Sequence, residues 1–147
     1  MEKLAPLGGV YQAGTYSGNP VSVAASLATL QSLKRRAGQV YPVLARTGEQ
    51  LRRGMSDLVE SSQFNAQVKG IASMFQIFFT DQSVTDYDSA KTSDTGKFDK
   101  YFHALLTSRV FVPPSQFETC FLSTSHTDDD IQLTLEAIGS TLTHLSA

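Results

Sequence analysis

The segment Ala13-Gly14-Thr15-Tyr16-Ser17-Gly18-Asn19-Pro20 constrains the fold of this chain more than any other. Asn is a favoured helix N-cap, and Pro suits the first helical position because its missing N–H would have no partner there. The segment therefore predicts a loop that enters a helix at Pro20. A helix N-terminus offers backbone N–H groups and the positive end of the helix dipole, which suit a phosphate. The segment fits neither a Walker nor a dinucleotide-binding pattern, so an ordinary surface loop remains the alternative.

Apolar residues at helical spacing predict four helices, over about 20–34, 41–60, 95–108 and from 128 onward. Gly38 is expected to end the first helix, and Pro42 to lie in the first turn of the second. Thr127 is expected to cap the last helix, whose first turn holds three aspartates. The polar face of the second helix is expected to be turned to water, with Arg46, Glu49, Arg52 and Arg53.

Alternating or β-branched and aromatic runs predict strands at 64–68, 74–80, 110–112 and 121–123, with a polar surface loop over 81–94. Few strands, each next to a helix, indicate an α/β protein whose main part is α+β. We expect a short, mainly antiparallel sheet with helices packed on one face. The glycine break predicts a boundary near 36–40, between segments 1–38 and 39–147.

The bulk composition excludes several functions. The chain has 147 residues, a net charge of −2 and no basic patch interleaved with aromatic residues, so nucleic acid is not an expected partner. No apolar run reaches the roughly 20 residues that a membrane helix needs. A single cysteine, Cys120, precludes an internal disulfide and suits a reducing cytosol. No Cys, His and carboxylate cluster has zinc spacing, so no metal site is expected.

Five segments occur in the same order as in the class III pyridoxal-phosphate (PLP)-dependent aminotransferases, which the chain resembles from Met1 to about His144. The segments are Gly14–Pro20, Ser73–Asp81, Tyr87–Asp94, Pro114–Glu118 and Ser125–Thr127. The first is similar to the segment that follows the family's catalytic lysine. The run Pro-Ser-Gln-Phe-Glu is distinctive of the family's aminomutase branch, although Ala72 stands where family members often have Gly.

The resemblance implies the C-terminal portion of the fold-type I PLP-dependent transferase fold. Segment 1–38 would be the tail of the large PLP-binding domain, and segment 39–147 the C-terminal small domain. The implied activity is an intramolecular amino transfer that converts glutamate-1-semialdehyde to 5-aminolevulinate for tetrapyrrole synthesis. PLP would be the cofactor, and a homodimer in the cytoplasm, or in the plastid stroma of a photosynthetic eukaryote, the working unit.

The resemblance also assigns roles to three residues. Gly14 and Thr15 would bind the PLP phosphate across the dimer interface, with Thr15 supplying its hydroxyl and backbone N–H. Glu118 would be a substrate-side carboxylate that faces the active site and holds an ammonium group. The alternatives from the residues alone are a turn hydroxyl for Thr15 and a solvated loop carboxylate for Glu118.

None of the six lysines lies in the glycine-rich, apolar setting of the family's Schiff-base lysine, so all are expected to be solvated charges: Lys3, Lys34, Lys69, Lys91, Lys97 and Lys100. The carboxylate that pairs with the pyridine nitrogen is also absent. This chain is therefore expected to be an inactive piece of a longer enzyme. His103, His126 and His144 are expected to be structural or surface residues.

Two other functions remain open at this point. Another class III ω-aminotransferase would share the fold and Thr15 but would not need the Pro-Ser-Gln-Phe-Glu run. A free-standing, non-catalytic domain that binds a phosphate ligand or a partner would need neither the lysine nor an upstream reading frame.

Overall fold

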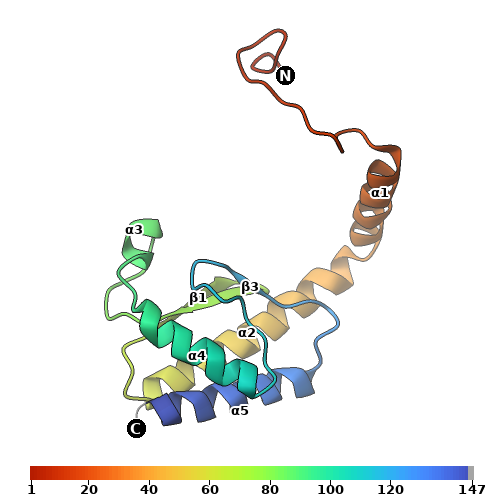
Figure 1. Ribbon diagram of the computed structural model, residues 1–147. Coiled ribbons are helices and arrows are strands. Elements are labelled where there is room, and N and C mark those ends of the chain that lie inside the picture. The colour runs from red at the N-terminus through yellow and green to blue at the C-terminus, as the bar shows by residue number, and fades with distance from the viewer. Residues whose placement is uncertain (146–147) are drawn as a thin grey trace. The chain divides into compact units, whose positions relative to one another are not determined.

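The computed structural model describes residues 1–145 (Figure 1). The chain divides into two compact units, Met1–Gly38 and Gln39–Ala147, and each is described by itself. Their assignment to the large and small domains of a longer enzyme stays a prediction.

The first unit holds an irregular N-terminal segment and helix α1, Pro20–Arg35. The expected N-cap is confirmed, because the Asn19 Oδ1 accepts hydrogen bonds from the backbone N–H groups of Val21 at 3.1 Å and Ser22 at 3.2 Å. The expected stop at Gly38 is wrong. The helix ends at Arg35, and the next helix begins at Ala37 and takes Gly38 into its first turn.

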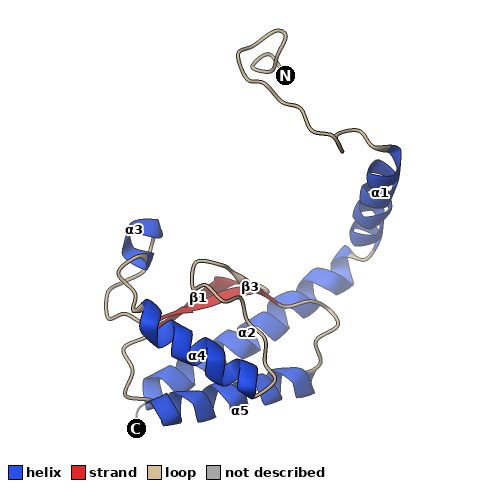
Figure 2. Cartoon of the chain, viewed as in Figure 1, coloured by secondary structure: helices blue, strands red, loops and turns tan. Residues whose placement is uncertain are grey.

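The second unit is built on three long helices (Figure 2). They are α2 (Ala37–Ser61), α4 (Thr95–Thr107) and α5 (Asp128–Leu145). The α2 helix starts four residues earlier than predicted, so Pro42 lies inside it and not in its first turn. Proline at that position removes one backbone hydrogen bond and leaves the rest of the helix in place.

Local capping chemistry fixes the starts of two helices, α5 and α3 (Tyr87–Ala90). Thr127 and Asp130 form a capping box at α5, with the Thr127 N–H donating to Asp130 Oδ2 at 2.7 Å. A second box joins Asp86 and Ser89 at the start of α3, a short helix inside the segment predicted as loop. These caps lower the pKa of Asp130 and of Asp86, in each case chiefly through hydrogen bonds from the backbone N–H of the capping partner.

The sheet has the strand order β1-β2-β3 and is antiparallel, which confirms the predicted type of sheet. Its strands are β1 (Gln67–Ile71), β2 (Met74–Phe78) and β3 (Cys120–Phe121). The predicted ends of the strands were wrong, because the ends of a strand depend on its pairing partner. Gln67 lies opposite Phe78 and Ile71 opposite Met74, so pairing with β2 sets the ends of β1. The run 110–112 is not a strand, because it joins no β-ladder within residues 1–145, and Val112 is buried in the core.

Alternate residues of the sheet face the helices. Phe75, Ile77 and Phe79 join the core with the buried residues of the long helices, including Leu51, Leu105 and Ile138. The opposite face carries Lys69 and Gln76, which are cross-strand partners. In Figure 1 the segment that precedes β3 arches over the sheet on this second face. The candidate site lies there.

Candidate functional site

The loop before α1 offers fewer helix N–H groups to an anion than the sequence indicated. Pro20 has none, Asn19 Oδ1 accepts from Val21 and Ser22, and the Asn19 carbonyl accepts from the Val23 N–H at 2.9 Å. The donors that remain lie one turn earlier. Within residues 1–145, the Thr15 hydroxyl and the N–H groups of Thr15 and Tyr16 have no hydrogen-bond partner.

The same loop is compact around Thr15. The Ser17 N–H donates to the Gly14 carbonyl at 2.9 Å, and a Cβ at Gly14 would lie 3.0 Å from the Ser17 hydroxyl. A side chain at position 14 would therefore crowd the turn. The donor set at Thr15 and Tyr16 fits a phosphate, which accepts several hydrogen bonds at once.

Glu118 lies at the end of a tight turn in the second unit. The Glu118 N–H donates to the Ser115 carbonyl at 3.0 Å, and the Phe117 N–H donates to the Ser115 hydroxyl at 3.2 Å. The Gln76 amide of β2 donates to the Glu118 carbonyl and reaches the Ser115 carbonyl at 3.5 Å. The turn is thus tied to the sheet while the Glu118 carboxylate stays exposed.

A cavity of about 370 Å³ opens beside this turn. Its wall includes Lys69 and Gln76 from the sheet, Tyr87 from α3, and Gln116 and Glu118 from the turn. Among the described residues, neither the Lys69 ammonium nor the Glu118 carboxylate has a hydrogen-bond or ion-pair partner. The cavity therefore presents both signs of charge to a ligand, and its volume suits a small molecule.

Sequence reasoning missed Gln76 and Gln116. Gln116 is 2% exposed, and its side-chain N and O have no hydrogen-bond partner in the described chain. Leaving such an amide unpaired costs about 1–3 kcal/mol, which is the kind of cost seen at functional sites. Burial of these two glutamines arises from tertiary packing, so no local pattern indicated it.

Five of the six lysines are exposed, as predicted. Lys91 pairs with Asp88 at 2.8 Å and Lys97 with Asp94 at 3.7 Å on exposed helix faces. Lys69 differs in that it is partly buried and lines the cavity. The expectation that Arg52 faces water is wrong, because its side chain is 15% exposed and donates to the Ala72 carbonyl.

The histidines lie on the surface. His103 is 3.5 Å from Asp99, and His126 Nδ1 accepts from the Ser123 N–H at 3.0 Å and so holds the turn before α5. His144 Nδ1 lies 2.7 Å from the Ser140 carbonyl. Cys120 is buried, and burial raises the pKa of its thiol to about 11. A thiol with that pKa is not a nucleophile at neutral pH.

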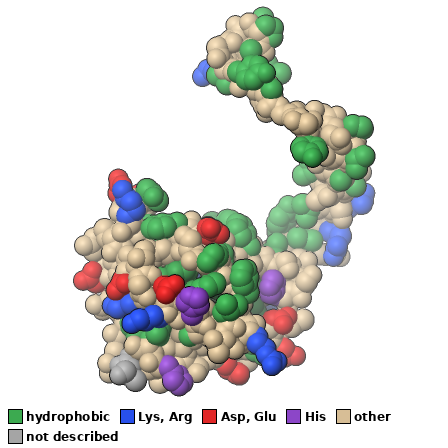
Figure 3. Space-filling model, viewed as in Figure 1, with side chains coloured by type: hydrophobic (Ala, Val, Ile, Leu, Met, Phe, Trp, Pro, Cys, Tyr) green, Lys and Arg blue, Asp and Glu red, His purple; other side chains and the backbone are tan. Residues whose placement is uncertain are grey.

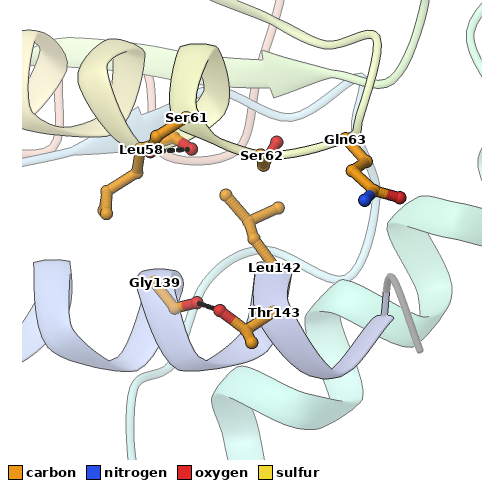
Figure 4. Close-up of a pocket in the computed structure, with 7 residues that line it drawn as sticks. All are labelled: Leu58, Ser61, Ser62, Gln63, Gly139, Leu142 and Thr143. Atoms are coloured by element: carbon orange, nitrogen blue, oxygen red, sulfur yellow. Dashed lines mark hydrogen bonds between the residues drawn. The ribbon is translucent and has the colours of Figure 1, made fainter.

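A second hollow lies between the C-terminal ends of α2 and α5 (Figure 4). Its hydroxyls bond their own helices: Ser61 to the Leu58 carbonyl at 3.1 Å and Thr143 to the Gly139 carbonyl at 2.9 Å. Leu58 and Leu142 extend between the two helices (Figure 4). The hollow offers no ionisable group, so it is a packing gap and not a catalytic site.

The surface in view mixes both signs of charge (Figure 3). No group of three or more His, Cys, Asp or Glu residues within 1–145 is placed to hold a metal ion. In the same range, no helix combines the length and the apolar character needed to cross a membrane.

Comparison with known proteins shows which enzymes the chain is similar to. No family model matches the chain. The chain is 50% identical over 145 residues to the glutamate-1-semialdehyde 2,1-aminomutase of Methanothermobacter thermautotrophicus, a match that covers 99% of this chain and 34% of that protein. It is 45% identical over 142 residues to the enzyme of the same name from Thermus thermophilus, covering 97% of this chain and 33% of that protein.

The chain resembles the glutamate-1-semialdehyde 2,1-aminomutases over nearly its whole length. It corresponds to the C-terminal portion of the family's sequence and spans about a third of the length of the curated relatives it matches. The resemblance read from the five segments is therefore confirmed.

Solved structures show the same fold. A glutamate-1-semialdehyde aminomutase from Pseudomonas aeruginosa PAO1 superposes with a TM-score of 0.78 at 18% identity, over 94% of this chain and 31% of that one. A β-phenylalanine aminotransferase from Variovorax paradoxus gives a TM-score of 0.77 at 28% identity, over 93% of this chain and 31% of that one. The predicted fold, the C-terminal portion of a PLP-dependent transferase, is confirmed.

Proposed function

We propose that the protein to which this chain belongs is a PLP-dependent aminomutase that converts glutamate-1-semialdehyde to 5-aminolevulinate. The observation that carries the proposal is the match to aminomutases over nearly the whole chain, which includes the Pro-Ser-Gln-Phe-Glu run. The last residue of that run, Glu118, lines a cavity of small-molecule size and has no partner for its carboxylate among residues 1–145.

PLP is the proposed cofactor, and one structure of similar fold is a transaminase with PLP bound. When bound, PLP supplies an electron sink to the reacting carbon and a carrier for the amino group. In this chain the Thr15 hydroxyl and the N–H groups of Thr15 and Tyr16 would hold the phosphate, and Gly14 keeps the turn open for it. The lysine that anchors PLP is expected elsewhere in the longer protein.

Glu118 is the proposed substrate-side carboxylate. Substrate and product are isomers that differ in which of two adjacent carbons carries the amino group, so an ammonium group must be retained near the reacting carbons. An unpaired carboxylate at the cavity wall can accept hydrogen bonds from that ammonium group and so hold the molecule that carries it in place. Glu118 therefore orients the nitrogen during the transfer.

The remaining proposals concern assembly and location. We propose a homodimer in which the loop around Thr15 serves the partner subunit's active site, and a cytoplasmic or plastid-stromal location consistent with tetrapyrrole synthesis. Sedimentation of the full-length, PLP-loaded protein tests the first, with a monomer contradicting it.

The deciding experiment is a substrate comparison in the full-length protein. Glutamate-1-semialdehyde should be isomerised without any added amino acceptor, and Glu118→Gln should lower kcat/KM for it by at least about tenfold, as expected when a charge-assisted contact is lost. Isomerisation at wild-type efficiency in Glu118→Gln would contradict the role of Glu118.

The runner-up is another class III ω-aminotransferase, which the likeness to the β-phenylalanine aminotransferase favours. Such an enzyme would require a separate amino acceptor and would turn over ordinary ω-amino donors. Turnover of those donors in place of glutamate-1-semialdehyde would replace the aminomutase proposal with this one.

A further inference from the structure

Beside Glu118, the backbone hydrogen bonds between β2 and β3 end and a side-chain hydrogen bond from Gln76 takes their place. The β2–β3 ladder consists of two pairs, Met74 with Phe121 and Phe75 with Cys120. The next residue of β2 is Gln76, and opposite it the chain has already left the sheet. The Gln76 side chain continues the bonding by donating to the Glu118 carbonyl and reaching the Ser115 carbonyl at 3.5 Å.

Both ends of the Gln76 side-chain amide form hydrogen bonds, and the residue is buried from water. Its Oε1 accepts from the Ile77 N–H at 2.9 Å, which fixes the orientation of its N–H groups toward the turn. Gln76 is 7% exposed, so water has little access to replace these hydrogen bonds, and their loss would leave buried polar groups unpaired. Removing the amide would leave the carbonyls of Ser115 and Glu118 without this donor.

The Glu118 carboxylate depends on its backbone for its position, because within residues 1–145 it makes no hydrogen bond or ion pair that would hold it. On its outer side the turn is held by Phe117, whose ring lies 5.7 Å from that of Tyr87. On its inner side it is held by Gln76. A displacement of about 1 Å at a substrate-binding group can cost a factor on the order of one hundred in rate.

We propose that Gln76 is a positioning residue that holds Glu118 in place at the cavity and thereby sets how productively the substrate's ammonium is bound. The inference rests on the proposed function, since it acts through Glu118.

The test is a double-mutant cycle in the full-length, PLP-loaded enzyme. Gln76→Met keeps the volume of the side chain and removes the donor. It should lower kcat/KM for glutamate-1-semialdehyde by about tenfold or more, mostly in kcat, when Glu118 is present. In the Glu118→Gln background the same change should have an effect of less than about twofold, because Gln76 no longer has a functional carboxylate to place.

A positional readout accompanies the kinetics. Hydrogen exchange at the Phe117 and Glu118 amides should accelerate in Gln76→Met, while exchange in β1 stays unchanged. If Gln76→Met fails to fold, Gln76→Glu, which keeps the size of the side chain and its acceptor, takes its place in the cycle.

The chain offers a matched control in Gln67. Its amide similarly ties β1 to a loop, donating to the Gln82 carbonyl and accepting from the Val84 N–H at 3.3 Å, but that loop does not carry Glu118. Gln67→Met should lower the melting temperature comparably, and it should lower kcat/KM clearly less than Gln76→Met does, because Gln67 contacts Val84 at the cavity wall and not Glu118.

The outcomes distinguish failure of the proposed role of Glu118 from failure of the proposed role of Gln76. Wild-type kcat/KM in Glu118→Gln would refute the role of Glu118 and with it this inference. A loss in Glu118→Gln combined with no loss in Gln76→Met, or with an equal loss from Gln76→Met in both backgrounds, would refute the positioning role alone.

Discussion

The proposed phosphate contact at Thr15 uses a side-chain hydroxyl and backbone N–H groups, and a single substitution can remove the hydroxyl alone. Thr15→Val removes the hydroxyl and keeps the shape, so the full-length protein should lose PLP at least about tenfold more readily on dialysis, followed by cofactor absorbance. Thr15→Ser keeps the hydroxyl and should retain PLP. Equal retention by the valine variant would indicate that Thr15 is only a turn residue.

Ala72 is a strained residue, with φ of 49° at the turn between β1 and β2. A left-handed conformation costs an L-residue about 1–2 kcal/mol, whereas glycine adopts it freely but loses about 0.4–1 kcal/mol through the unfolded chain. Ala72→Gly should therefore stabilise the protein by roughly 0.5–1 kcal/mol in urea unfolding. The exposed helical Ala45→Gly should do the opposite, by about 1 kcal/mol.

Cys120 makes the stability depend on alkaline pH. Burial raises the pKa of its thiol from 9.0 to about 11, so the unfolded chain loses this proton first as the pH rises. The stabilisation is complete below pH 9 and is lost by about pH 11. The melting temperature of the wild type should therefore fall relative to Cys120→Ala across this window, and a constant difference between the two would contradict the assignment.

The elements show what a sequence can predict on its own. The starts of α4 and α5 were predicted to the residue because each cap is local: the Lys97 N–H donates to Asp94 Oδ1 at 3.0 Å, and Thr127 pairs with Asp130. The limits of β1 were missed because they depend on β2, a separate segment. In the candidate site, the motif led to the proposal of Glu118, whereas the contact of Gln76 with the turn could not be predicted because it depends on tertiary packing.

Two glycines inside α2, Gly48 and Gly54, have a packing reason. A Cβ at Gly48 would lie 1.8 Å from the Ala72 carbonyl oxygen, and one at Gly54 would lie 2.7 Å from Leu135 Cδ1. Glycine at these positions lets the helix approach the hairpin turn and α5 closely. Arg52, one turn after Gly48, binds the same Ala72 carbonyl.

Gly48→Ala should consequently destabilise the protein by about 1–3 kcal/mol, because backbone must move to admit the methyl group. Gly38→Ala is the matched control in the same helix: its Cβ would meet nothing within 4 Å, and the higher helix propensity of alanine should raise stability by up to about 1 kcal/mol. Chemical denaturation of both variants measures the two effects. Equal and small changes would show that α2 does not press on the hairpin at Gly48.

At the scale of the whole molecule, each of the two units carries one of the proposed binding groups. The first unit has hydrogen-bond donors at Thr15 that fit a phosphate, and the second unit has the Glu118 carboxylate. The chain spans about a third of its relatives' length. The proposed reaction needs a lysine that is desolvated enough to bind PLP covalently at neutral pH, and every lysine of this chain is exposed or only partly buried.

The 147-residue chain should therefore show no turnover of glutamate-1-semialdehyde by itself. Incubation with PLP followed by borohydride should label its lysines without preference, because every one of them is exposed or only partly buried. The full-length protein should instead carry one PLP group, fixed to a lysine outside this chain. Peptide mass mapping distinguishes the two patterns, with intact mass confirming that each preparation holds a single polypeptide. Turnover by the 147-residue chain, together with selective labelling of one of its six lysines, would show that the chain carries its own catalytic lysine.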